Sequence, residues 1–195
     1  MLKRIDILSI IRDHFKTLKG LDQEDDRISL QDFFLFIMLP SAISFMLVVN
    51  HFTFEQQIGN LISAISIFGG FLFNLLAIIY SQIDKIRQDS VSRTINQDPE
   101  ELLLKQKFVN EIHKNISFCI VLSISIVVTL LLNTVEMPKS KYFHYLEIFI
   151  EFVTYFLLGL FLLTLLMVVN RVYILLKKDS QDNNQNNTNA SSTTT

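Results

Sequence analysis

The sequence has few of the residues that build redox, metal or catalytic centres. It contains one cysteine, Cys119, four histidines and no tryptophan in 195 residues. A single cysteine excludes a disulfide framework and a cysteine zinc cluster. The histidines are scattered without a pair at metal-ligand spacing, so we interpret all four as surface or interfacial residues: His14, His51, His113 and His144.

Motifs that carry catalysis are missing as well. The chain has no glycine-rich phosphate loop, no nucleophile elbow, no histidines one helical turn apart and no carboxylate pair in the middle of an apolar run. We therefore expect no enzymatic activity, no catalytic residues, no cofactor and no metal. This leaves binding, structural and membrane functions.

Charge is absent from long stretches of the chain. No Asp, Glu, Lys or Arg occurs from Gln56 through Ile83, and half of all residues are hydrophobic, with a net charge of only −2. This pattern predicts an all-α multi-pass membrane protein whose first partner is the lipid bilayer. The balance of charge gives no reason to expect direct nucleic-acid binding.

The longest uncharged run, 58–81, carries small and polar residues on one side of a helix. These residues recur at steps of three or four, about 3.7 on average, close to the ~3.6 residues of a helical turn. Since about 20 apolar residues cross the ~30 Å hydrocarbon core, this run is predicted to span the membrane. We call this set the small-residue stripe: Gly59, Ser63, Ser66, Gly70, Asn74, Ala77 and Ser81.

The small-residue stripe has two interpretations, which the sequence leaves open. In the first interpretation, the stripe is a helix-packing seam within one bundle, because small residues let helix backbones approach closely in lipid. Alternatively, several copies turn it toward a shared axis, so that it lines a water-filled pore. Asn74 is its bulkiest polar side chain and the residue least suited to face lipid.

Two carboxylates lie at the predicted outer end of the bundle. Glu147 and Glu151 lie one helical turn apart at the start of the last apolar run. In an oligomer they form an acidic outer mouth that attracts cations. As single residues they are interfacial carboxylates solvated by headgroups.

Four predicted crossings and three polar segments divide the chain. Residues 1–32 form an amphipathic helix followed by an acidic linker, and this helix lies in the headgroup plane or packs on another helix. The first two crossings, within 33–80, form an antiparallel hairpin, and Pro40 interrupts the first of them. The remaining segments are a helical hairpin at 81–115, two crossings within 116–170 and a disordered tail at 171–195.

Lysines and arginines predict the orientation. Six lie in the amino-terminal segment, six in the central hairpin and three in the carboxy-terminal segment, whereas the two short loops on the other side hold none and two. By the positive-inside rule, both termini and the hairpin are cytoplasmic in an inner, or plasma, membrane.

These features predict a non-enzymatic membrane effector or sensor that forms homo-oligomers and perturbs or conducts across the membrane. In layout alone, the chain resembles the small multi-span effectors of bacterial anti-phage and abortive-infection systems, although no motif carries the resemblance. The alternative is a membrane scaffold that holds a cytoplasmic protein through residues 81–115. A small-molecule transporter is a weaker third candidate, because no ionisable residue lies at mid-membrane.

Overall fold

The protein is described by a computed structural model that covers residues 6–17, 30–52, 55–92, 99–135 and 141–192. All regular structure in these ranges is helical, as predicted, and no strand occurs in them. The elements are α1 (Ile7–Thr17), α2 (Leu30–Val49), the short 3-10 helix η2 (Glu55–Gln57), α3 (Ile58–Ser92), α4 (Pro99–Asn133) and α5 (Lys141–Ser192).

Three helices are long and apolar enough to cross a membrane. The candidate spans are Ile58–Asp84 of α3, Gln106–Asn133 of α4 and Lys141–Ile174 of α5. These three agree with the predicted second, third and fourth crossings. The apolar part of α2, Phe34–Val49, is shorter, about 24 Å at ~1.5 Å per residue, so the predicted first crossing stays a prediction.

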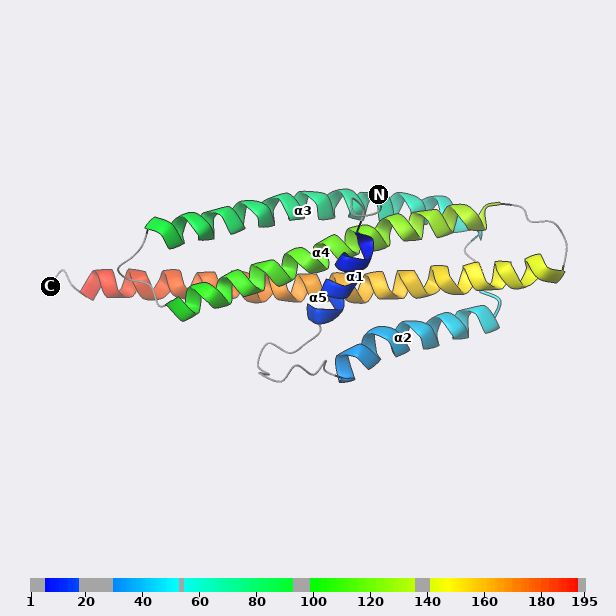
Figure 1. Ribbon diagram of the computed structural model, residues 1–195, viewed down its shortest axis with the longest axis horizontal. Helices are drawn as coiled ribbons and strands as arrows, with labels where there is room; N and C mark the ends of the chain where they lie inside the picture. Colours follow the sequence, from blue (N-terminus) through cyan, green and yellow to red (C-terminus); the bar gives the residue numbers. More distant parts are fainter. Residues whose placement is uncertain (1–5, 18–29, 53–54, 93–98, 136–140, 193–195) are drawn as a thin grey trace.

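The long helices lie side by side, with α4 and α5 in the middle (Figure 1). On one flank α3 packs against α4, and on the other α2 packs against α5. In the described part of the chain, α2 therefore packs on α5 instead of forming a packed hairpin with α3, contrary to our prediction. The two helices are neighbours in sequence but belong to opposite flanks.

The absence of a side chain at Gly159 lets α2 pack closely on α5. A Cβ placed on Gly159 would lie 3.1 Å from Cβ of Pro40, so the missing side chain makes room for the rigid proline ring. Tyr155 of α5 also donates a hydrogen bond from its hydroxyl to the backbone oxygen of Phe52, just after α2. Both contacts hold α2 against α5.

The serines beside Pro40 do not replace the hydrogen bond that the proline removes. Ser41 donates to the Ile37 carbonyl at 2.6 Å and Ser44 to the Pro40 carbonyl at 2.7 Å. The carbonyl that loses its donor through the proline belongs to Phe36, four residues before it. The serines instead bond to other carbonyls of the same helix.

A left-handed residue ends α2. His51 has φ of 52°, and the Phe52 amide donates to Leu47 O at 3.0 Å while the His51 amide donates to Val48 O at 3.0 Å. This pair of bonds is the Schellman motif, in which glycine is the preferred residue at the left-handed position.

We expect His51→Gly to stabilise the fold by about 1 kcal/mol, because glycine adopts positive φ without steric cost. The measurement is the midpoint of detergent-induced unfolding. The control is Asn50→Gly. Asn50 does not have a positive φ, so glycine relieves no steric strain there. Equal effects of the two substitutions would contradict the assignment.

The helices α3 and α4 both extend beyond their apolar regions into polar sequence. Within 81–115, α3 runs on to Ser92 and α4 begins at Pro99, where proline suits the first helical position. The cytoplasmic hairpin in this segment stays a prediction. The structure differs at the carboxy terminus, since α5 continues to Ser192 where we predicted disorder from residue 171. No proline or glycine follows Gly159, and extending a formed helix is far easier than starting one.

Candidate functional site

The small-residue stripe lies on the outside of the described helices. All seven of its residues are exposed, whereas α3 packs on α4 through a different face that carries Ile65, Leu72 and Ile79. The stripe is therefore not the seam that α3 uses within this chain. No described helix of the chain covers the stripe, which leaves it open to lipid or to another molecule.

Two adjacent glycines show how differently the faces of α3 are used. A Cβ on Gly69 would lie 3.2 Å from the Ser123 hydroxyl oxygen of α4, but a Cβ on Gly70 would meet nothing within 4 Å. Gly59, also in the stripe, has the same open space. Gly69 serves the contact inside the chain, and Gly70 leaves a flat outer surface.

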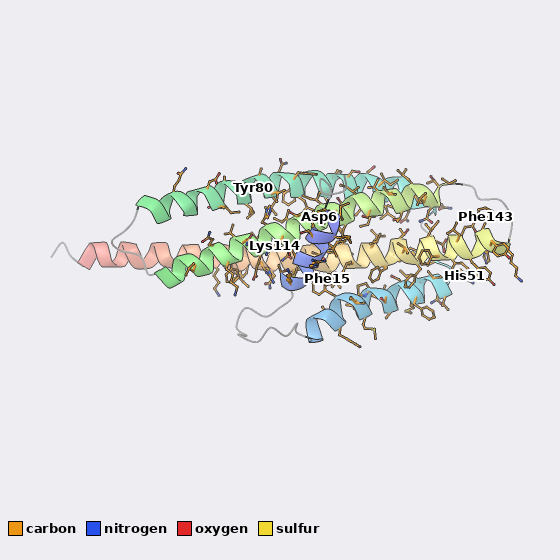
Figure 2. The ribbon with its side chains drawn as sticks, in the orientation of Figure 1. Asp6, Phe15, His51, Tyr80, Lys114 and Phe143 are labelled. Atoms are coloured by element: carbon orange, nitrogen blue, oxygen red, sulfur yellow. The ribbon has the colours of Figure 1, made fainter. Side chains whose placement is uncertain are left out.

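The predicted acidic mouth lies at one end of the bundle, which we call the loop end. His51 and Phe143 mark this end in Figure 2. Glu147 is exposed and lies 3.8 Å from Nδ1 of His144, while Glu151 is half-buried one turn further along α5. The two carboxylates are thus next to each other in one chain, as their spacing predicts.

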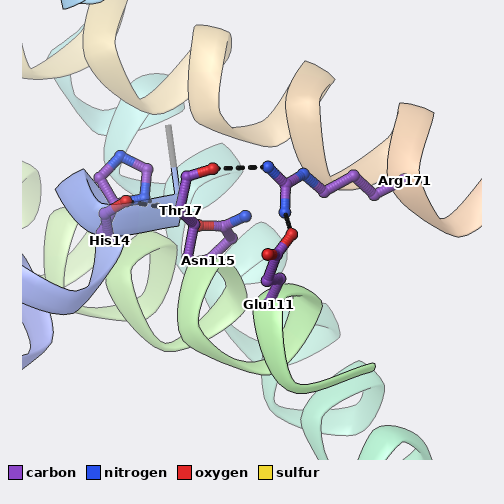
Figure 3. A network of polar contacts seen from close by, with 5 residues as sticks. All are labelled: His14, Thr17, Glu111, Asn115 and Arg171. Atoms are coloured by element: carbon purple, nitrogen blue, oxygen red, sulfur yellow. Dashed lines mark hydrogen bonds and ion pairs between the residues drawn. The ribbon is translucent and has the colours of Figure 1, made fainter. Parts of the chain in front are cut away.

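A cluster of buried polar residues, not predicted from the sequence, lies where α1 crosses α4 and α5 (Figure 3). Its members come from three helices, and we call it the docking cluster: His14 and Thr17 of α1, Glu111 and Asn115 of α4, and Arg171 of α5. His14, Thr17 and Asn115 are almost completely buried. Buried polar groups require partners, so these residues select one position for α1.

His14 corrects our prediction of a surface histidine. It is fully buried, and its ring stacks on Phe118 with centroids 3.9 Å apart. Nδ1 lies 2.9 Å from Oδ1 of Asn115. Burial lowers the pKa of His14 to about 4; the hydrogen bond to Asn115 opposes this shift and the Arg171 cation adds to it.

Arg171 connects the other members. Its guanidinium donates to a carboxylate oxygen of Glu111, with which it forms an ion pair, and donates at 2.8 Å to the backbone oxygen of Thr17. The Thr17 hydroxyl lies 2.7 Å from both the His14 carbonyl oxygen and Asn115 Oδ1, so two acceptors share its single proton. One cation thus holds the last turn of α1 and joins α4 to α5.

Only the spacing of these residues was visible in the sequence. Glu111 and Asn115 are one turn apart on one helix, and His14 and Thr17 are nearly one turn apart on another. Such spacing is common on exposed helix faces and does not reveal which helices meet. Among the described residues, His, Cys, Asp and Glu form no group of three that fits a metal ion.

Comparison with known protein families, curated proteins and solved structures gives no match. The class of the protein therefore rests on its own fold. It is an all-helical protein with three helices of membrane-spanning length and composition.

Proposed function

We propose that the chain is a non-enzymatic multi-pass effector or sensor of a bacterial inner membrane, as in anti-phage or abortive-infection defence. Copies associate through the small-residue stripe of α3 and perturb or conduct across the membrane. Both termini and the hairpin at 81–115 face the cytoplasm, because the lysines and arginines concentrate in these segments.

The observation that carries the proposal is the exposure of the stripe. Asn74 lies in its centre, exposed and without a hydrogen bond to other described residues. A polar amide that faces hydrocarbon alone is unfavourable, and polar side chains in spans face a partner or water. A second copy of α3 offers both a matching flat surface and amide groups that complement Asn74.

Membrane depolarisation tests this function. Wild type and Asn74→Leu are expressed at equal membrane levels in a bacterium, and the membrane potential is followed with a dye. We expect wild type to depolarise the cells and Asn74→Leu to lose this effect, because leucine removes the polar group from the shared axis.

Phe71→Leu is the matched control. Phe71 is exposed on the same helix but lies outside the stripe, so this variant should depolarise like wild type. No depolarisation by wild type would contradict the effector proposal and favour the scaffold, whose partner a pull-down with residues 81–115 would then identify. Equal loss in both variants would contradict the role of the stripe.

A further inference from the structure

His14 occupies the centre of the contact that α1 makes with the bundle. Its ring lies against Phe118 of α4 and has Phe36 of α2 at its edge, with centroids 6.2 Å apart. Asn115 Oδ1 only accepts hydrogen bonds, so Nδ1 of His14 carries the proton of the neutral ring. The other nitrogen, Nε2, is buried and has no partner in the described part of the chain.

A second proton on His14 would have no acceptor among the described residues. It would sit on the buried Nε2, and a buried charge without a partner is strongly unfavourable. In solvent the same imidazolium is hydrated and stable.

Among the described side chains, the charged groups around the cluster offer no compensation. Asp13 of α1 is within 3.5 Å of Lys16, and Glu111 of α4 is paired with Arg171 of α5. Arg171 of α5 adds positive charge near His14, whereas the His113 ring of α4 lies against Tyr80 of α3. On the side of α2, the apolar part Phe34–Val49 contains no Asp, Glu, Lys or Arg, and the one charged residue of that helix, Asp32, precedes it.

We propose that α1 is a proton-sensitive latch, which stays docked on α4 and α5 while His14 is neutral and detaches when His14 is protonated. The geometry described above carries this proposal, and it goes beyond the proposed function because docking does not depend on what the spans conduct. Release would free Arg171 and Glu111 from the last turn of α1 and would open the contact with α2.

The direction of the pH effect follows from the two states. Burial holds the pKa of docked His14 near 4, below its ordinary value of 6.5. Above pH 6.5 both states are neutral and docking is unaffected. As the pH falls below 6.5, only the detached state takes up the proton, so the ratio of docked to detached chains falls about tenfold per pH unit until docked His14 itself titrates.

The distance between spin labels on α1 and α4 tests the latch. Labels are attached to cysteines at the exposed positions Ser9 and Asn110 of the full chain in lipid nanodiscs, with Cys119→Ala as background. At pH 7.5 we expect one short distance. At pH 4.5 we expect a longer, broad component to dominate, and an unchanged distance would overturn the proposal.

Substitutions identify the titrating group. His14→Gln stays neutral and keeps an amide that reaches Asn115, so it should remain docked at both pH values. His113→Gln is the matched control on α4 and should keep the wild-type midpoint. A transition that survives in His14→Gln, or that disappears in His113→Gln, would overturn the proposal.

His14→Phe provides the second neutral variant, because it preserves stacking on Phe118. If His14→Gln is detached at pH 7.5, a His14→Phe chain that stays docked at both pH values supports the latch. Detachment of both neutral variants at pH 7.5 would show that hydrogen bonds and not charge control docking, and it would overturn the proposal.

Discussion

Arg171→Ala should destabilise the folded chain by about 3–5 kcal/mol, the cost of leaving one partner of a buried ion pair unpaired. The side chains of Arg171 and Glu111 are only 12% and 13% exposed. Without the guanidinium, the Glu111 carboxylate stays buried with no counter-charge, and the Thr17 carbonyl loses its donor. The measurement is unfolding in mild detergent by titration with a denaturing detergent, followed by circular dichroism.

Two variants control this prediction. Lys177→Ala removes an exposed cation from the same helix and should change stability by less than ~0.5 kcal/mol. Arg171→Met combined with Glu111→Gln removes both charges. This double variant should lose clearly less unfolding free energy than the two single variants lose in sum. An effect of Arg171→Ala as small as that of Lys177→Ala would contradict the docking cluster.

Leucine at two adjacent glycines should give opposite results. Gly70→Leu meets open space, so the monomer should keep its fold and gain up to ~1 kcal/mol from helix propensity. Its self-association should weaken roughly tenfold or more, because the side chain prevents close approach of a second α3. Gly69→Leu instead clashes with Ser123, and overpacking of this kind costs roughly 1–3 kcal/mol.

Two measurements on the same samples separate these effects. Energy transfer between labelled chains in liposomes reports self-association, and denaturing-detergent titration at high lipid dilution reports monomer stability. A Gly70→Leu chain that associates like wild type would contradict the stripe as the contact between copies. A Gly69→Leu chain as stable as wild type would contradict the packing of α3 on α4.

The latch and the stripe lie on different parts of the molecule. The docking cluster joins α1, α4 and α5, whereas the stripe lies on the exposed face of α3. Variants of His14 should therefore change docking without changing association through Gly70. This separation lets the two proposals fail independently.

Sequence alone determined the class of the protein and the positions of its long helices. The uncharged runs in α3, α4 and α5 match the three candidate spans, because hydrocarbon excludes charge and requires about 20 apolar residues per crossing. Pro99 at the first position of α4 was also readable, since the proline ring suits a helix start. These are local properties, each set by a single segment and its solvent.

Only the tertiary structure decided which faces meet. The period of the small-residue stripe was visible, but not that α3 turns it outward and packs on α4 through Leu72. His14 became a buried residue through Asn115, which is 101 positions away, and Arg171 holds an oxygen 154 positions away. Helical periodicity shows that a face exists, but its partner depends on shape and hydrogen-bond complementarity between distant segments.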